Sequence, residues 1–182
     1  MRKFLDRLYL ASGWIAAFFI VAICVLVVAQ VCLNLIDRIA GIMTGTAIGL
    51  TIPSYADFTG FFLAAASFLA LAHTIRQGAH IRVTLFISHL PAGIARMVEF
   101  WCVAVGAAAS VYFSWYTAIL VWESYTFNDL SPGMIAVPLW IPQTAMFLGL
   151  VILSIALIDE FIGLVRGNTP SYATAAEEVS GE

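Results

Sequence analysis

The feature that most constrains this chain is an uninterrupted run without charged residues from Leu8 to Ile36. As a helix, this run of about 29 residues would be roughly 44 Å long. About 20 residues suffice to cross the hydrocarbon core of a bilayer. A secretory signal has an apolar region of only about 7–15 residues. We therefore predict a membrane-spanning helix that tilts or projects beyond the bilayer.

The composition of the whole chain agrees with this interpretation. Charged residues make up only 10% of the sequence, and 62% of the residues are hydrophobic. Soluble domains carry about 25% charged residues, so lipid must be the solvent for much of this surface. The net charge of −3 comes with no basic stripe, which argues against a nucleic-acid partner.

Three further apolar segments follow the first, and we predict an all-α integral membrane protein with four transmembrane helices. One membrane domain is expected over residues 1–166, followed by a disordered cytoplasmic tail over 167–182, which is polar and rich in small residues. The predicted spans are residues 8–36, 58–75, 93–122 and 137–164.

The basic residues predict how these helices are oriented. With the N-terminus in the cytoplasm, Arg38 is the only one of the eight lysines and arginines that falls outside, as the positive-inside rule requires. Both termini are therefore expected inside. Trp14 and Trp101 would then lie near the inner interface, and Trp122 and Trp140 near the outer one, as in an aromatic belt.

The polar stretch over residues 77–87 separates the second and third spans. Val83, Phe86, Ile87 and Leu90 recur at helical spacing, which favours a short amphipathic helix on the cytoplasmic membrane surface. Alternating apolar residues leave a strand formally open, but a lone strand has no partner at a bilayer. Residues that could hold lipid headgroups here, or simply anchor the chain inside, are Arg76, His80, Arg82 and Arg96.

The linker over residues 39–57 is apolar but interrupted. Gly41, Gly45 and Gly49 are four residues apart, a spacing typical of helix-packing faces. Interspersed threonines make a loop or interfacial element the favoured prediction, with a packed helix as the alternative. Just before this linker, Gln30 and Asn34 lie one helical turn apart, either at the interface or bonded to a partner helix.

The third and fourth spans carry two local signals. Gly106, Ser110 and Ser114 form a stripe of small residues that predicts a helix contact. Pro138 and Pro142 flank the start of the fourth span, and an internal proline removes a hydrogen bond. We therefore expect a kink or a delayed helix start.

No pattern in the sequence indicates catalysis. The middles of the spans carry no Asp, Glu, Lys, Arg or His, although such groups mark proton and ion pathways. The histidines gather at one side, whereas a two-haem cytochrome needs ligands at two depths. No paired-cysteine or catalytic motif is present. We predict no catalytic, cofactor-binding or metal-binding residues and no enzyme. Backbone carbonyls can also bind ions, so a small exporter or an electron-transfer anchor stays open as the alternative.

Two motifs carry a family resemblance. They are Ala79-His80-Ile81-Arg82-Val83 followed by Leu90-Pro91, and Leu130-Ser131-Pro132 leading into Pro138-Leu139-Trp140-Ile141-Pro142. With the order and spacing of the spans, they resemble the DctQ-like small membrane subunit of TRAP (tripartite ATP-independent periplasmic) transporters. The similarity extends from Leu8 to about Arg166. The linker is longer and more apolar than is usual in that family, and its acidic pair is reduced to Asp57.

The resemblance implies a scaffold subunit in a bacterial inner membrane. Its partners would be a large elevator-type membrane subunit, which holds the substrate and sodium sites, and a periplasmic binding protein that delivers an organic acid or related solute. Membrane lipids would surround it. The loop over 123–137 carries Glu123 and Asp129 but no basic residue. We expect these two carboxylates to contact the binding protein, unless the loop is merely solvated.

Overall fold

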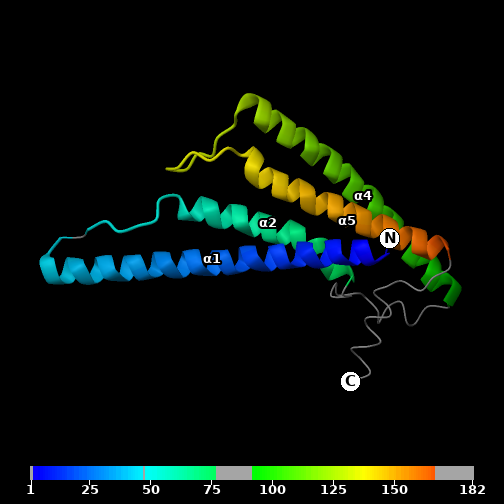
Figure 1. The fold of residues 1–182 in the computed structure, drawn as a ribbon, viewed down its shortest axis with the longest axis horizontal. Coiled ribbons are helices and arrows are strands. Elements are labelled where there is room, and N and C mark those ends of the chain that lie inside the picture. The colour runs from blue at the N-terminus through cyan, green and yellow to red at the C-terminus, as the bar shows by residue number, and fades with distance from the viewer. Residues whose placement is uncertain (1, 47, 77–91, 167–182) are drawn as a thin grey trace, which may run out of the picture.

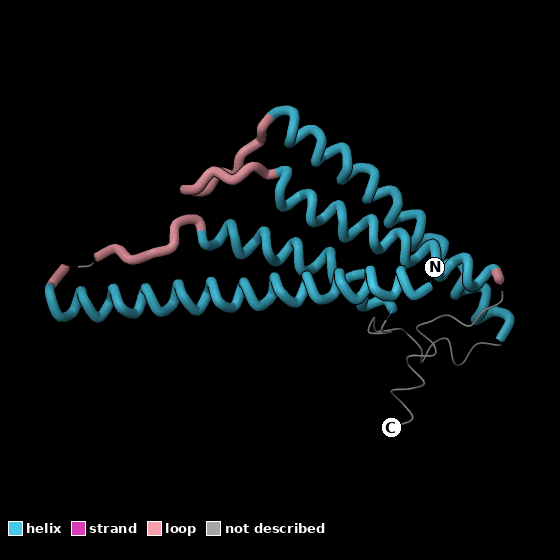
Figure 2. Tube along the Cα trace, in the orientation of Figure 1, coloured by secondary structure: helices cyan, strands magenta, loops and turns pink. Residues whose placement is uncertain are grey.

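The computed structural model describes residues 2–46, 48–76 and 92–166. These residues form four long helices (Figures 1 and 2), namely α1 (Arg2–Thr44), α2 (Tyr55–Arg76), α4 (Ala92–Phe127) and α5 (Trp140–Val165). All four are long and apolar enough to cross a membrane. The predicted all-α class with four spans is confirmed. The surface helix expected within 77–91 and the tail over 167–182 lie outside the described residues.

The four helices form an open row. α2 packs against both α1 and α5, and α4 packs against α5, while α1 barely touches α5. The order in space is therefore α1, α2, α5, α4, with α1 and α4 at the two edges. The hairpins α1–α2 and α4–α5 converge near the N-terminus and diverge toward their connecting loops (Figure 1).

Small residues allow the helices of this row to approach closely. A Cβ placed on Gly149 of α5 would lie 2.5 Å from the carbonyl carbon of Phe68 in α2. A Cβ on Gly106 of α4 would lie 3.7 Å from Leu157 of α5. Close backbone approach through small residues is how helices associate in membranes, where burial of apolar surface gives little driving force.

The buried core lies where the two hairpins converge. Tyr9 of α1, Ala72 of α2 and Ala156 of α5 form one cluster. The hydroxyl of Ser12 in α1 donates to the carbonyl oxygen of Leu69 in α2. This hydrogen bond joins the first two helices beside the cluster. The N-terminal part of α1 is thus fixed to two neighbours, whereas its distal part meets only its own linker.

α1 is longer than the span predicted from the uncharged run. Its 43 residues correspond to about 65 Å, and the helix continues past Ile36 to Thr44. It ends where Gly45 adopts φ +75° and donates its N–H to the carbonyl of Gly41 at 3.0 Å, a glycine-dependent helix end. Gly49 also has positive φ, at +79°. The three glycines therefore do not form one helical face.

The remaining boundaries are close to the predicted ones. α2 and α4 each extend a few residues beyond the ranges 58–75 and 93–122. α5 begins at Trp140, so Pro138 precedes the helix and Pro142 falls in its first turn. Proline is tolerated there because the first amides of a helix have no partner within it. The start of the fourth helix is delayed rather than kinked.

Candidate functional site

The two connecting segments, residues 45–54 between α1 and α2 and residues 128–139 between α4 and α5, lie at the same end of the molecule (Figure 2). We call this end the loop end. Several polar contacts between distant parts of the chain are found here, and they hold described residues of both segments in place.

Gln30 holds the linker against α1. Its side-chain oxygen accepts the N–H of Ile52 at 2.8 Å, and its amide nitrogen donates to Thr51 and to Asn34, each at 3.0 Å. Gln30 is only 5% exposed. Gln30 of the predicted Gln30–Asn34 pair thus bonds to the chain's own linker as well as to Asn34.

Asp37 provides the second attachment of the linker. One carboxylate oxygen accepts the backbone N–H groups of Ile48 at 2.7 Å and of Gly49 at 2.8 Å. Hydrogen bonds to an ionised acceptor are stronger than those between neutral groups. The favoured prediction of a loop is therefore right for residues 48–54, whereas residues 39–44 continue α1 and residues 55–57 begin α2.

A third contact joins the two hairpins at the loop end. The hydroxyl of Ser54 accepts the N–H of Ile135 at 2.9 Å. A Cβ on Gly133 would overlap the carboxylate of Asp57, so glycine permits this approach. We call the contact formed by Ser54, Asp57, Gly133 and Ile135 the latch. It bridges the ends of α2 and α5, which diverge here (Figure 1).

The predicted contact residues for a binding protein, Glu123 and Asp129, are both exposed at the loop end. The backbone of Asp129 is fixed, because its N–H donates to Ser124 at 3.1 Å and its carbonyl accepts from Leu139 at 2.9 Å. Asp37 and Asp57 add two further carboxylates nearby, and Arg38 is the only basic residue of this end among the residues described. The loop end is therefore acidic.

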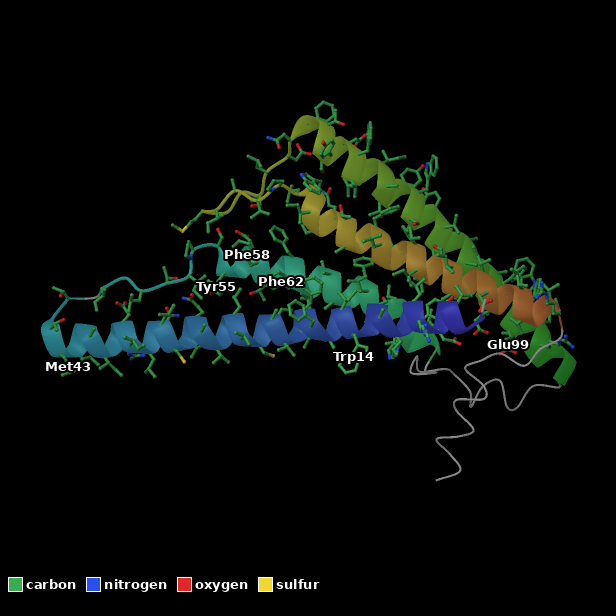
Figure 3. All side chains as sticks on the ribbon, viewed as in Figure 1. Trp14, Met43, Tyr55, Phe58, Phe62 and Glu99 are labelled. Carbon is green, nitrogen blue, oxygen red and sulfur yellow. The ribbon has the colours of Figure 1, made fainter. Side chains whose placement is uncertain are left out.

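The predicted anchoring residues are spread along the row. Trp14, Trp101 and Trp122 are exposed, and Trp14 lies on the side of α1 that faces away from α2 (Figure 3). Trp140 is half-buried and meets Tyr125 edge-on, with ring centroids 5.8 Å apart.

The basic members of the same group are described only in part. Arg96 is exposed near the start of α4. Arg76 ends α2, and its side chain is not among those described. His80 and Arg82 lie outside the described residues.

The predicted packing stripe falls on the side of α4 that meets α5. Ser110 and Ser114 are buried, and Gly106 faces Leu157. The hydroxyl of Ser110 donates back to the carbonyl of Ala107 at 2.9 Å, so it needs no acceptor on the neighbouring helix.

Side chains that could hold a metal ion are not gathered in the described part of the chain. No cluster of three or more His, Cys, Asp or Glu side chains occurs among these residues. Cys24, Cys32 and Cys102 are free and exposed. Glu160 is buried in the last turns of α5.

Comparison with known families agrees with this architecture. The family model described as "Tripartite ATP-independent periplasmic transporters, DctQ component" matches residues 38–167. The chain belongs to the DctQ family. The match begins in the last turns of α1 and includes the linker, the latch, α2, α4 and α5. It identifies the chain as the small membrane component of a TRAP transporter, and neither curated proteins nor solved structures give a further match.

Membership in the DctQ family explains several features of the site. A component of a tripartite transporter shares its task with other chains, and its own helices need not enclose a substrate pathway. The polar residues of this DctQ chain position its linker and loops instead. The contacts of Gln30, Asp37 and Ser54 were missed from the sequence, because each joins residues whose proximity depends on the fold.

Proposed function

We propose that this chain is the scaffold subunit of a sodium-coupled TRAP transporter that imports an organic acid or a related solute across a bacterial inner membrane. The large elevator-type subunit would carry the substrate and sodium sites, and a periplasmic binding protein would deliver the solute. The observation that supports this most directly is the open row of helices, in which no helix is surrounded on all sides by other described parts of the chain.

An open row of helices is suited to forming a fixed surface rather than an enclosed pathway. A pathway needs helices around it, and here α4 packs mainly against α5, and α1 packs mainly against α2 with a small contact to α5 near its N-terminus. Large apolar side chains are exposed along both edges, such as Phe18 and Val25 of α1 and Val105 and Ile119 of α4. Lipid or another membrane protein must cover them. A mobile transport domain could slide against such a fixed surface.

The loop end supports the proposed docking of the binding protein. Gln30, Asp37 and the latch fix its two segments, so that little ordering is needed when a partner binds. The exposed carboxylates Glu123 and Asp129 would attract a basic surface on the binding protein and speed its encounter with the transporter.

The scaffold role is tested by purifying the chain alone and together with the large subunit of its transporter. We expect one-to-one co-purification, and uptake into proteoliposomes only when both membrane subunits and the binding protein are present. Transport by the isolated chain would favour the alternative of a small exporter. Haem absorbance in the purified chain would favour an electron-transfer anchor.

The docking role is tested by the double charge reversal Glu123→Lys and Asp129→Lys. We expect the concentration of binding protein needed for half-maximal uptake to rise several-fold, with a larger effect at low salt because the Debye length is longer there. The double change Glu177→Lys and Glu178→Lys, in the tail, is a control with the same change in net charge. Equal uptake curves for the two variants would contradict docking through these carboxylates.

A further inference from the structure

The two edges of the helix row carry different chemistry. α4 packs against α5 through the side that holds Ser110 and Ser114. On the opposite side Tyr112, Trp115 and Tyr116 are 58%, 68% and 54% exposed. We call these three residues the mid-span aromatic cluster. The rings of Tyr112 and Tyr116 are in contact, with centroids 4.6 Å apart, and Trp115 lies about one turn from Tyr112 on the same side of the helix.

The cluster lies deep within the span. Glu99 and Glu123 are the charged residues that bound the apolar part of α4. They are about 36 Å apart along the helix, and Tyr112 is only about 2 Å from the midpoint between them. Trp115 and Tyr116 lie within about 8 Å of the same midpoint.

Tyrosine and tryptophan usually occupy the interfaces of a bilayer, where their polar tips reach water or headgroups. At mid-span these tips have no water, and hydrocarbon offers no acceptor. The described residues provide no hydrogen bond to the hydroxyls of Tyr112 and Tyr116 or to the indole of Trp115. By contrast, the hydroxyl of Thr117 on the same helix donates to the carbonyl of Phe113 at 2.7 Å. The side chain of a tyrosine is too long to form such a bond to its own helix.

The opposite edge of the row lacks this feature. The exposed residues in the middle of α1 include Phe18, Val21, Val25 and Val28, none of which has a side-chain donor. Such a face is compatible with acyl chains. α4 also has the lowest hydropathy of the four spanning helices. The exposed face of α1 is therefore compatible with lipid, whereas the exposed face of α4 requires hydrogen-bond acceptors from a neighbour.

We propose that the mid-span aromatic cluster of α4 is the surface that packs against transmembrane helices of the large subunit, which supply oxygen acceptors at the middle of the bilayer. This inference rests on the proposed function, because it assigns that partner to one edge of the row. Ala108 and Ala109, exposed one turn before the cluster, allow a neighbouring helix to approach closely.

A second copy of this chain fits the surface less well. Two facing copies would bring together six donors and four hydroxyl oxygens, so the indoles and the hydroxyls would compete for the same oxygens. A helix of a different chain can present acceptors without further donors. The α4 edge also continues the row, since the other side of α4 is already occupied by α5.

The proposal is tested by photo-crosslinking in the assembled transporter within its membrane. A photoreactive phenylalanine analogue replaces Tyr112 in one sample and Val25, at a lipid-compatible position of α1, in another. We expect the Tyr112 position to crosslink to the large subunit at least several-fold more than the Val25 position. Adducts with lipid only, a crosslinked pair of this chain, or equal yields from both positions would overturn the proposal.

A second measurement tests the contribution of the two tyrosine hydroxyl groups separately from that of their rings. The double variant Tyr112→Phe and Tyr116→Phe keeps both rings, and Tyr125→Phe removes a hydroxyl near the loop end as the matched control. We expect the double variant to retain at most half as much large subunit during detergent purification as the wild type or the control does. Equal retention would overturn the proposal. If the wild-type chain itself retained no large subunit, the proposed function would fail as well, and the two failures are thereby distinguished.

Discussion

At the scale of single residues, this protein depends on close approaches that only small side chains allow. Gly149 meets the backbone of Phe68, and Gly13 meets the ring of His73, where a Cβ would lie 2.8 Å from the ring carbon Cγ. These contacts set the spacing of α2 from its two neighbours. A side chain can turn aside to admit a methyl group, whereas backbone cannot, so the two glycines differ in how much change they tolerate.

The first prediction concerns Gly149. In Gly149→Ala the new methyl group would meet the Phe68 carbonyl group at 2.5 Å, and α2 and α5 would have to move apart. We expect a loss of about 1–3 kcal/mol in unfolding free energy, as for other overpacked sites. Thermal unfolding in detergent micelles provides the measurement.

The control for this substitution lies on the same helix. Gly163 has open space around its Cβ position, so Gly163→Ala should be neutral or stabilise α5 by up to about 1 kcal/mol through helix propensity. If both variants unfolded at the same temperature, the close approach at Gly149 would not limit packing.

The second prediction concerns Gln30. Gln30→Leu preserves the volume but leaves the N–H of Ile52 without its acceptor, which typically costs about 1–3 kcal/mol for a buried group. We expect hydrogen exchange at Ile52 to become faster by one or two orders of magnitude, in proportion to that free energy. Asn34→Ala, which removes only the side-chain pair, should leave this amide protected. Equal exchange in both variants would mean that Gln30 does not hold the linker.

At the scale of elements, the length of α1 sets it apart from the other helices. Gln30 is bonded to Thr51 and Ile52, only a few residues before α2 begins at Tyr55. α1 therefore extends about 21 Å further, from Gln30 to Thr44, and Figure 3 shows Met43 at its tip well beyond Tyr55. Even at a tilt of 40°, the whole helix would cover about 50 Å of depth, more than the hydrocarbon core of about 30 Å.

The third prediction treats the latch as a unit that couples the two hairpins. Gly133→Ala should displace the Asp57 carboxylate and weaken the bond between Ser54 and Ile135. Asp57→Ala should relieve that overlap. In a double-mutant cycle we therefore expect the pair to be less destabilising than the sum of the single changes, by about 0.5–3 kcal/mol. Additive effects on the unfolding free energy would show that the two loops are independent.

Elements with uniform hydropathy were predictable from the sequence, whereas the linker was not. The four helices follow from runs long enough to span a bilayer, and Pro138 and Pro142 located the start of α5. In the linker, regular glycine spacing imitates a helix, but positive φ at Gly45 and Gly49 breaks it. The bonds from Gln30 and Asp37 that stabilise this conformation join residues 11 to 22 positions apart. Local sequence patterns do not contain that information.

At the scale of the whole molecule, the row order of the helices could not be read from their hydropathy, which is similar on all sides of a spanning helix. The latch could not be predicted from the sequence either, because Ser54 and Ile135 are 81 positions apart. The acidic character of the loop end was accessible, since the absence of basic residues around Glu123 and Asp129 is visible in the sequence itself.

The fourth prediction concerns orientation in the membrane. Cys24, Cys32 and Cys102 are exposed and unpaired, so replacing all three with alanine should change stability little. In that background we expect Asp129→Cys to react with a membrane-impermeant maleimide in intact spheroplasts. Arg166→Cys should react only after the membrane is opened. The reverse pattern would place the loop end in the cytoplasm.

The open row also has a consequence for the life of this chain in the cell. The folded chain exposes large apolar faces that lipid or another membrane protein must cover. Its stability therefore rises with the concentration of its partner subunit, through mass action. We expect chains made in excess over the large subunit to open more often and to be removed by membrane proteases, because degradation follows the population of open forms. The abundance of the small component would then follow that of the large one without any dedicated control of its synthesis.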